Sequence, residues 1–415
     1  MRVRTLFLFL TGDRQAILDL AADRRAVWVG LLFVLSAGFA REYDGQDLLR
    51  EPWHLLVPVG ASLAAASVLF LVACGRLLFR PKKRPPLLTA YRSFLTLFWM
   101  TAPLAWLYAI PYERFLSPGS ATSANLWTLA LVAAWRVALM VRVVSVLTGR
   151  KTVSALVLVM TVADAAALTA VFLMPWPVLS GMGGVRQTES ESAVSGATMT
   201  VACYGLFSAP FWFFCGLNAV LSEKPVWQVP YAPAEATVPT RAVWALAVLS
   251  LVIWLPILPW TQAEQQLRSQ VERDMNSGRI AEGLDVLSAH AQSDFPPQWE
   301  PPPRIGYRAS SPPILDVMDV LVVRECAPWV RQCYVNKFGR FVGGVTGFYF
   351  GPTRGDELAR VVRLLELLPE GPAIVAEHAG RLESLLGRSN VSETTRVRLD
   401  ALLKLAEVKA AKPGP

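Results

Sequence analysis

Two ionisable residues lie in apolar stretches where a charge is costly. Arg136 lies in LWTLALVAAWRVALMV and Asp164 in VSALVLVMTVADAAALTAV. At the centre of a membrane helix each would cost about 2.5–3.5 kcal/mol, so such residues usually find a partner. Both are fourteen positions from residue 150, in the short turn between the two stretches, and therefore lie at one depth. The sequence predicts an Arg136–Asp164 ion pair, because arginine can bind a carboxylate with two hydrogen bonds.

This pair has two interpretations. It could line a path for a substrate or a proton, or it could be an internal staple that fixes helix orientation. The alanines beside Asp164 would allow the helices to approach closely. A transporter usually carries more than one polar pair at the midplane, and no apolar stretch here holds a string of Asp, Glu or His. The staple is therefore the favoured interpretation, and the path stays open.

Cys326 and Cys333 are the second pair whose types could do chemistry. They are seven positions apart, or about 10 Å on one straight helix, which is too far for a disulfide. Pro328 between them would break that helix, and a location outside the cell would be oxidising. A disulfide and two buried thiols are both compatible with the sequence.

Catalytic and metal-binding patterns are not found. The chain has 5 Cys and 3 His, and none of them form a cluster with zinc-ligand spacing. Gly-x-Ser-x-Gly, His-Glu-x-x-His, phosphate-loop and dinucleotide-binding motifs are absent. We therefore expect no cofactor and no metal, and an enzymatic activity is not favoured.

The composition indicates the elements that must hold these residues. The 415 residues are 53% hydrophobic and 17% charged, with a mean hydropathy of +0.38. A soluble domain has about 45–50% apolar and about 25% charged residues. The apolar excess lies in residues 1–260, while residues 261–415 resemble soluble protein. This pattern excludes an ordinary cytosolic enzyme, a disordered chain and a secreted disulfide scaffold.

We predict an all-α fold: a polytopic transmembrane helix bundle of about seven spans (26–260), followed by a mainly α-helical soluble domain (261–408). A span needs about 20 apolar residues. The predicted spans lie near residues 26–40, 55–74, 94–110, 126–147, 153–174, 198–221 and 242–260. The first is short, and Gly38-Phe39-Ala40 resembles a signal-peptide cleavage site, so cleavage is the alternative to a first crossing. Prolines inside three spans could be hinges or static bends.

Charge counting gives a direction through the membrane. Residues 1–260 hold 21 Lys/Arg and 13 Asp/Glu, which is the whole net charge of +8, and the remainder holds 19 of each. With the N-terminus inside, 16 basic residues fall in cytoplasmic segments and 4 in outer loops. The sequence thus predicts a cell-membrane protein with a cytoplasmic N-terminus and an extracytoplasmic C-terminus. A neutral C-terminal half gives no support for nucleic-acid binding.

The segments at the two ends of the chain carry weaker signals. Residues 1–25 would form an amphipathic cytoplasmic segment, either on the inner leaflet or packed under the bundle. The proline-rich residues 295–313 would be a linker or a strap. In 340–352 a β-hairpin would turn at Gly343-Gly344, and 409–415 would be a disordered tail.

The resulting expectation for function is a multi-pass membrane anchor or scaffold without enzymatic activity. Its bundle would sit in the lipid bilayer, and residues 261–408 would bind another envelope protein. The alternative is a small-solute or ion transporter, or a channel-like protein, that uses Arg136 and Asp164. The arrangement is similar to that of bacterial integral-membrane proteins, but architecture alone carries no activity. Substrate, partner and oligomeric state are not specified by the sequence.

Overall fold

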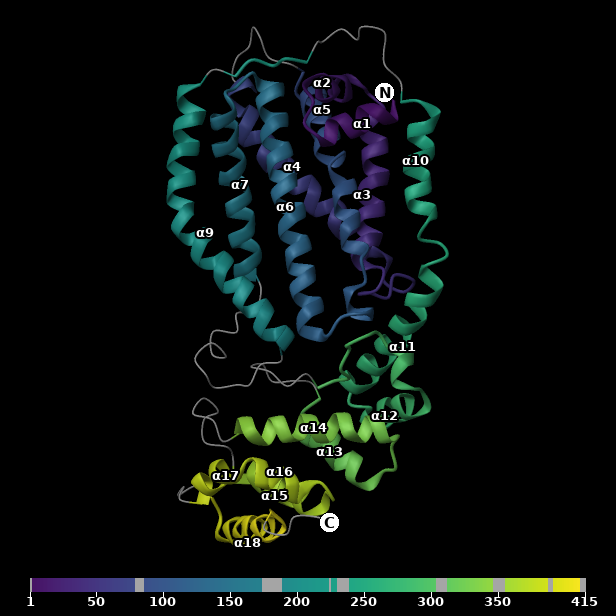
Figure 1. Cartoon of the computed structure of the whole chain (residues 1–415), viewed down its shortest axis with the longest axis vertical. Helices are drawn as coiled ribbons and strands as arrows, with labels where there is room; N and C mark the ends of the chain where they lie inside the picture. The colour runs from purple at the N-terminus through teal and green to yellow at the C-terminus, as the bar shows by residue number, and fades with distance from the viewer. Residues whose placement is uncertain are drawn as a thin grey trace. The chain divides into compact units, whose positions relative to one another are not determined.

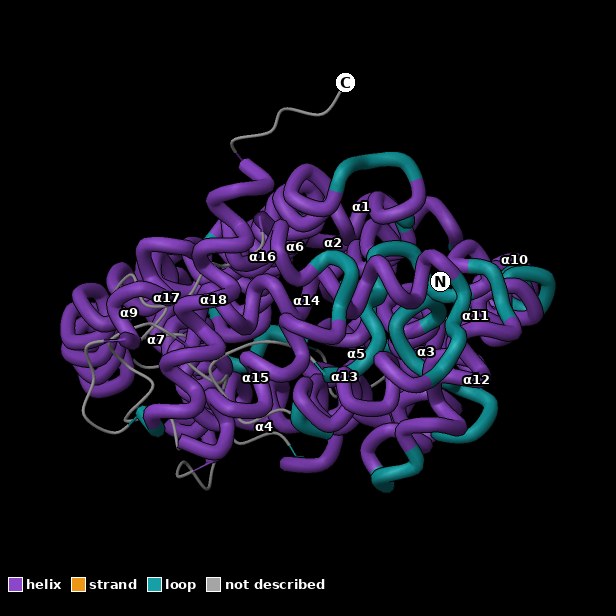
Figure 2. The backbone as a smooth tube through the Cα atoms, turned by 90° about the horizontal axis from the view of Figure 1, so that it is seen from below, coloured by secondary structure: helices purple, strands orange, loops and turns teal. Residues whose placement is uncertain are grey.

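The computed structural model describes residues 2–78, 86–173, 189–223, 225–229, 239–303, 312–345, 355–386 and 391–410. Its regular secondary structure is helical throughout these residues (Figure 2). The chain divides into two compact units. The membrane unit comprises Met1–Trp176 and Glu189–Ala263, and the C-terminal unit is formed mainly by Glu264–Pro415.

The membrane unit is a bundle of roughly aligned helices (Figure 1). Its helices are α1 (Val3–Leu10), α2 (Arg14–Ala22), α3 (Ala26–Glu42), α4 (Leu56–Leu78), α5 (Leu87–Trp99), α6 (Pro118–Thr148), α7 (Thr152–Leu173), α9 (Glu189–Ser222) and α10 (Arg241–Val252). The short 3₁₀ helices are η1 (Pro52–Leu55), η2 (Ala102–Ala109) and η3 (Tyr112–Arg114).

Five helical segments among the described residues are long and apolar enough to cross a membrane. They are Pro52–Leu77, Leu87–Arg114, Pro118–Thr148, Thr152–Leu173 and Glu189–Ser222. Each overlaps one of the predicted spans. The other two predicted spans correspond to α3, which has 17 residues, and α10, which has 12. The length and composition of the described helices therefore support five spans and do not confirm the predicted seven.

The predicted seventh span is not one continuous helix. It is divided into α10 and α11 (Leu258–Asn276) by turns around Pro256. Proline has no N–H to donate and disfavours helical backbone at the residue before it. The N–H groups of Trp254 and Leu255 accordingly bond to carbonyls three residues earlier, those of Leu251 and Val252, as in a turn. Pro103 has a related effect, since the third predicted span changes there from α5 to the 3₁₀ helix η2.

The core of the membrane unit lies around α3. This helix packs against α4, α5, η2 and α10. The Ser36 hydroxyl donates to the Ser250 carbonyl at 2.6 Å and accepts from the Trp254 indole at 3.2 Å. Beyond α3, the buried Gln262 amide donates to two carbonyls of the following loop and accepts from the Leu48 N–H at 2.7 Å. Packing thus fixes both α3 and the loop that follows it.

The N-terminal segment packs against this bundle. Leu6 and Phe9 of α1 and Ile17 of α2 are buried in the same core as Phe94 of α5. The Ser93 hydroxyl also donates to a carbonyl at the end of α2, at 2.6 Å. Of the two placements open from the sequence, the structure has the helices packed on the bundle.

The C-terminal unit has a separate apolar core. After α11 its helices are α12 (Ile280–Ala289), α13 (Ile314–Val323), α14 (Pro328–Val345), α15 (Gly355–Leu367), α16 (Gly371–Glu377), α17 (Ala379–Leu386) and α18 (Glu393–Ala410), with the 3₁₀ turn η4 (Gln292–Asp294). Leucines and valines of these helices, together with Tyr334 and Phe338, form the core.

The predicted β-hairpin is wrong for residues 340–345, which continue α14 as helix. A Cβ atom at Gly343 would lie 2.9 Å from the His378 ring. This glycine therefore permits close packing of a helix rather than a turn. Residues 346–352 of the predicted hairpin lie outside the described residues.

Candidate functional site

Arg136 lies on α6, where its guanidinium faces α5. The guanidinium carbon is 4.5 Å from the centre of the Phe98 ring, a cation–π geometry. The Nε atom of Arg136 is buried and has no hydrogen-bond partner among the described residues. The side chain as a whole is only partly buried.

Asp164 lies on α7 and faces α9. Its Oδ1 atom accepts a hydrogen bond from the Ser208 hydroxyl at 3.2 Å, while Oδ2 is buried without a partner among the described residues. A Cβ atom at Gly205 would lie 3.3 Å from Oδ1 and 2.8 Å from Leu168. The lack of a side chain at Gly205 therefore allows α7 and α9 to come this close.

The structure does not bring Arg136 and Asp164 together. Their helices α6 and α7 are neighbours, as predicted, but the ion pairs found among the described residues do not include these two. Equal depth on two helices leaves the rotation about each helix axis undetermined. Here that rotation turns Arg136 toward α5 and Asp164 toward α9.

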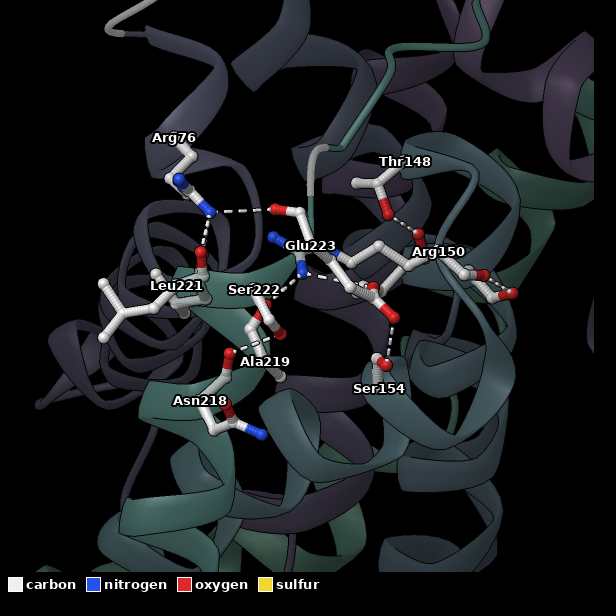
Figure 3. Close-up of polar contacts among 12 residues, drawn as sticks. Arg76, Thr148, Arg150, Ser154, Asn218, Ala219, Leu221, Ser222 and Glu223 are labelled. Atoms are coloured by element: carbon white, nitrogen blue, oxygen red, sulfur yellow. Dashed lines mark hydrogen bonds and ion pairs between the residues drawn. The ribbon is translucent and has the colours of Figure 1, made fainter.

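A cluster of polar contacts in the membrane unit lies elsewhere, at the C-terminal end of α9 (Figure 3). We call it the arginine junction; it consists of Arg76, Arg150, Ser154 and Glu223. Arg76 comes from the last turn of α4, Arg150 from the turn between α6 and α7, and Ser154 from the first turn of α7. Residues that are far apart in the sequence thus converge on one helix end.

The two arginines of the junction cap α9. The last four carbonyls of a helix have no partner within the helix. Arg150 donates to the Ala219 carbonyl at 2.7 Å, and Arg76 donates to the carbonyls of Val220, at 2.8 Å, and Leu221. Positive charge at this end is also favoured by the helix dipole. Three of the four end carbonyls of α9 are therefore satisfied by arginine.

Glu223 completes the junction. Its carboxylate accepts from the Ser154 hydroxyl at 2.6 Å and from Arg150 at 3.4 Å. Burial lowers the pKa of Arg150, and the negative charge of Glu223 opposes that shift. The Arg150 side chain is 1% exposed, so the carboxylate supplies the charge balance that water cannot.

Local backbone geometry positions Arg150. Gly149 ends α6 in the left-handed region with φ of 64°, a common helix terminator. The chain after α9 then lies along this turn, with Val226 N–H donating to the Thr148 carbonyl and Gln228 N–H to the Leu147 carbonyl, each at 2.9 Å. The junction thus ties α4, the α6–α7 turn and α9 together.

Asp44, in the loop after α3, has an unusual ionisation. The pKa of its carboxyl is raised to about 6, chiefly by burial and also by the negative charge of Glu113. The same loop is held by Gln262 and by Tyr43, whose hydroxyl donates to the Ala109 carbonyl at 3.1 Å. The charged form of Asp44 is therefore disfavoured in the folded protein.

In the C-terminal unit, α14 holds the proline-rich segment as a strap. Tyr334 donates to the Pro302 carbonyl at 2.6 Å, and Lys337 donates to the carbonyls of Pro301 and Pro303. The fully buried Lys337 ammonium is 3.6 Å from a Glu300 carboxylate oxygen. Burial lowers the pKa of Lys337, and the negative charge of Glu300 opposes this shift. Residues 304–311 lie outside the described part of the chain.

Cys326 and Cys333 are free thiols. Cys326 precedes α14 and Cys333 lies within it, and burial raises the pKa of both. A raised pKa disfavours the reactive thiolate. Among the described residues, no group of three or more His, Cys, Asp and Glu side chains could hold a metal ion.

In the sequence, Arg76 and Arg150 contribute only to the count of cytoplasmic basic residues, and no role is predicted for Glu223. A signal was present, since Glu223 is a lone acid at the end of an apolar stretch, near the predicted inner edge where these arginines also lie. Asp44 and Lys337 had no comparable signal, because their burial depends on contacts distant in sequence.

Comparisons with protein families, with curated proteins and with solved structures found no match to this chain.

Replacing Arg150 by methionine should destabilise the membrane unit by about 2 kcal/mol, because the Ala219 carbonyl loses its 2.7 Å hydrogen bond and the partly buried Glu223 carboxylate loses its charged partner, keeping the bond from Ser154. Thermal unfolding of the full chain in detergent measures this as a lower melting temperature. Lys151→Met, at the exposed neighbouring position, should leave the melting temperature unchanged. Equal melting temperatures for both variants and the unaltered protein would show that the junction has no stabilising role.

Asp44→Asn should stabilise the protein at neutral pH. Because the folded-state pKa of Asp44, about 6, lies above its ordinary value of 3.8, ionisation lowers folding stability as pH rises from about 4 to about 6. The melting temperatures of the variant and the unaltered protein should coincide near pH 4, separate up to pH 6 and stay separated above it. A difference that does not vary between pH 4 and pH 7 would contradict this explanation.

Proposed function

We propose that this protein is a multi-pass membrane anchor, without enzymatic activity, that presents its C-terminal unit to another protein of the cell envelope. The observation that carries the proposal is the placement of the bundle's charged groups. Arg76 and Arg150 bind the end of α9, and Arg150 also pairs with Glu223. Arg136 and Asp164 face different neighbours. These contacts hold helices together, which supports a structural role for the bundle.

We further propose seven crossings, with a cytoplasmic N-terminus and an extracytoplasmic C-terminus. In this topology α3 is a crossing in addition to the five long segments. Its 17 residues would be about 26 Å long, close to the ~30 Å hydrocarbon thickness. Because α3 is surrounded largely by protein, it does not need the apolar length of a lipid-exposed helix. The seventh crossing is α10 with the turns around Pro256.

The C-terminal unit offers a surface for a partner. Leu367 of α15 and Val397 of α18 are 52% and 61% exposed. Each adjoins one member of the Glu366–Arg398 ion pair, which links the two helices. Apolar side chains beside a charged pair give the mixture of apolar core and polar rim that protein interfaces use.

A transporter remains the second candidate. The buried Nε of Arg136 and Oδ2 of Asp164, which have no partner among the described residues, are groups that a polar solute could bind. Their separation onto different helix faces makes a shared path less favoured than an anchor.

The proposed topology predicts that a reporter active only outside the cytoplasm will be active when fused after residue 415. The same reporter fused at residue 151, in the α6–α7 turn, should be inactive, because that turn is proposed to be cytoplasmic. Activity at 151 and inactivity at 415 would invert the proposed orientation.

A photo-crosslinking amino acid at Val397 should capture a discrete partner protein in native membranes. The matched control is Lys404, an exposed position in the same helix, where no adduct is expected. Leu367→Asp should abolish the adduct formed from position 397, because it places a charge in the proposed apolar contact. Equal adducts at both positions, or none at either, would remove support for this surface.

A further inference from the structure

Arg136 and Asp164 are charged residues at membrane depth for which the described residues of one chain supply no opposite charge. Neither has an ion-pair partner among the described residues, and each has one buried polar atom without a hydrogen bond there. Such groups are expensive in lipid unless an opposite charge approaches. Among the described residues each therefore lacks a counter-charge, and the two residues carry opposite charges.

Their depths match. Each is fourteen positions from residue 150, on the antiparallel helices α6 and α7 on either side of the turn. A rotation about the membrane normal moves a residue around the bundle but keeps its depth. Residues of equal depth in one chain therefore remain at equal depth in two copies related by that rotation.

We propose that a second copy of this chain supplies the missing partners, so that Arg136 of each copy pairs with Asp164 of the other. A two-fold axis along the membrane normal makes such contacts reciprocal, and it produces two identical ion pairs per dimer. Each pair is bidentate in character, since guanidinium and carboxylate match in geometry.

Small exposed residues lie close to both residues along their helices. Ala133 and Ala134 on α6 are exposed, and so are Ala165 and Ala166 on α7, directly after Asp164. Small residues let membrane helices come close enough for polar side chains to bond across the contact. Arg136 and Asp164 are themselves partly exposed, and the proposed pair requires each side chain to turn from its present neighbour toward the second copy.

The experiment counts subunits of the full chain in lipid nanodiscs or in liposomes at low protein density, by stepwise photobleaching of a fluorescent tag. The unaltered protein should be dimeric. Arg136→Gln and Asp164→Asn should each reduce the dimer fraction at least tenfold at the same protein-to-lipid ratio. Arg142→Gln, which removes another arginine of α6 that bonds to the Gly12 carbonyl, should leave the dimer fraction unchanged.

Mixing the two neutralised variants is the decisive arm. A mixed dimer of Arg136→Gln with Asp164→Asn keeps one complete Arg–Asp pair, whereas either variant alone keeps none. Differently tagged copies should therefore co-purify from the mixture more than from either variant by itself. A pair formed within one chain would gain nothing from mixing.

A steric variant tests the same contact without changing charge. Ala165→Trp adds bulk at the exposed position that directly follows Asp164, and it should abolish the dimer while leaving the melting temperature in detergent unchanged. Leu173→Trp, which adds the same bulk at an 81% exposed position at the end of α7, should leave the dimer intact. A single subunit for the unaltered protein at every lipid ratio, failure of the mixture to exceed its components, or persistence of the dimer in Ala165→Trp would each overturn the proposal.

Discussion

Polar groups inside an apolar helix bundle cannot rely on water, so they need partners supplied by the protein, and this constraint explains the main contacts of the membrane unit. The C-terminal end of α9 shows it most clearly, because arginines from two other segments satisfy three of its carbonyls. Gln262 does the same for the loop after α3, and the Ser36 hydroxyl serves both an indole and a carbonyl of the α10 region. Each of these contacts joins segments distant in sequence, so satisfying polar groups also fixes the arrangement of helices.

The same constraint separates the charges of the bundle into two classes. Arg150 and Glu223 balance each other at a helix end, and their contacts are complete apart from the Arg150 Nε atom. Among the described residues, Arg136 contacts the face of the Phe98 ring and Asp164 accepts from one hydroxyl, and neither has an ion-pair partner there. A ring face offers a weaker and less directional attraction to a guanidinium than a carboxylate does. The first class accounts for how the bundle holds together, and the second is the class that the proposed second copy would pair.

How much the sequence could predict depends on the kind of information required. Apolar length located the long helices, and the position of the α6–α7 turn placed Arg136 and Asp164 on neighbouring helices. Hydropathy carries no information on rotation about a helix axis, so the contacts of either residue could not be derived. A glycine in the sequence is ambiguous in the same way, because it favours a turn but also permits close helix packing. Gly343 is predicted to be in a turn, but it lies inside α14, where the missing side chain makes room for His378. Burial by distant segments also decides the properties of Asp44 and Lys337, and that too is a property of the fold.

The number of crossings illustrates why packing has to be considered together with length. Helices α3 and α10 are short for a lipid-exposed span, yet they pack against each other through Ser36 and Ser250, and α3 lies in the core of the bundle. Because they are joined in this way, both should cross the membrane or neither should. With both the chain crosses seven times, and with neither five times. Either number is odd, so the proposed placement of the two ends of the chain on opposite sides of the membrane does not depend on how these two helices are counted.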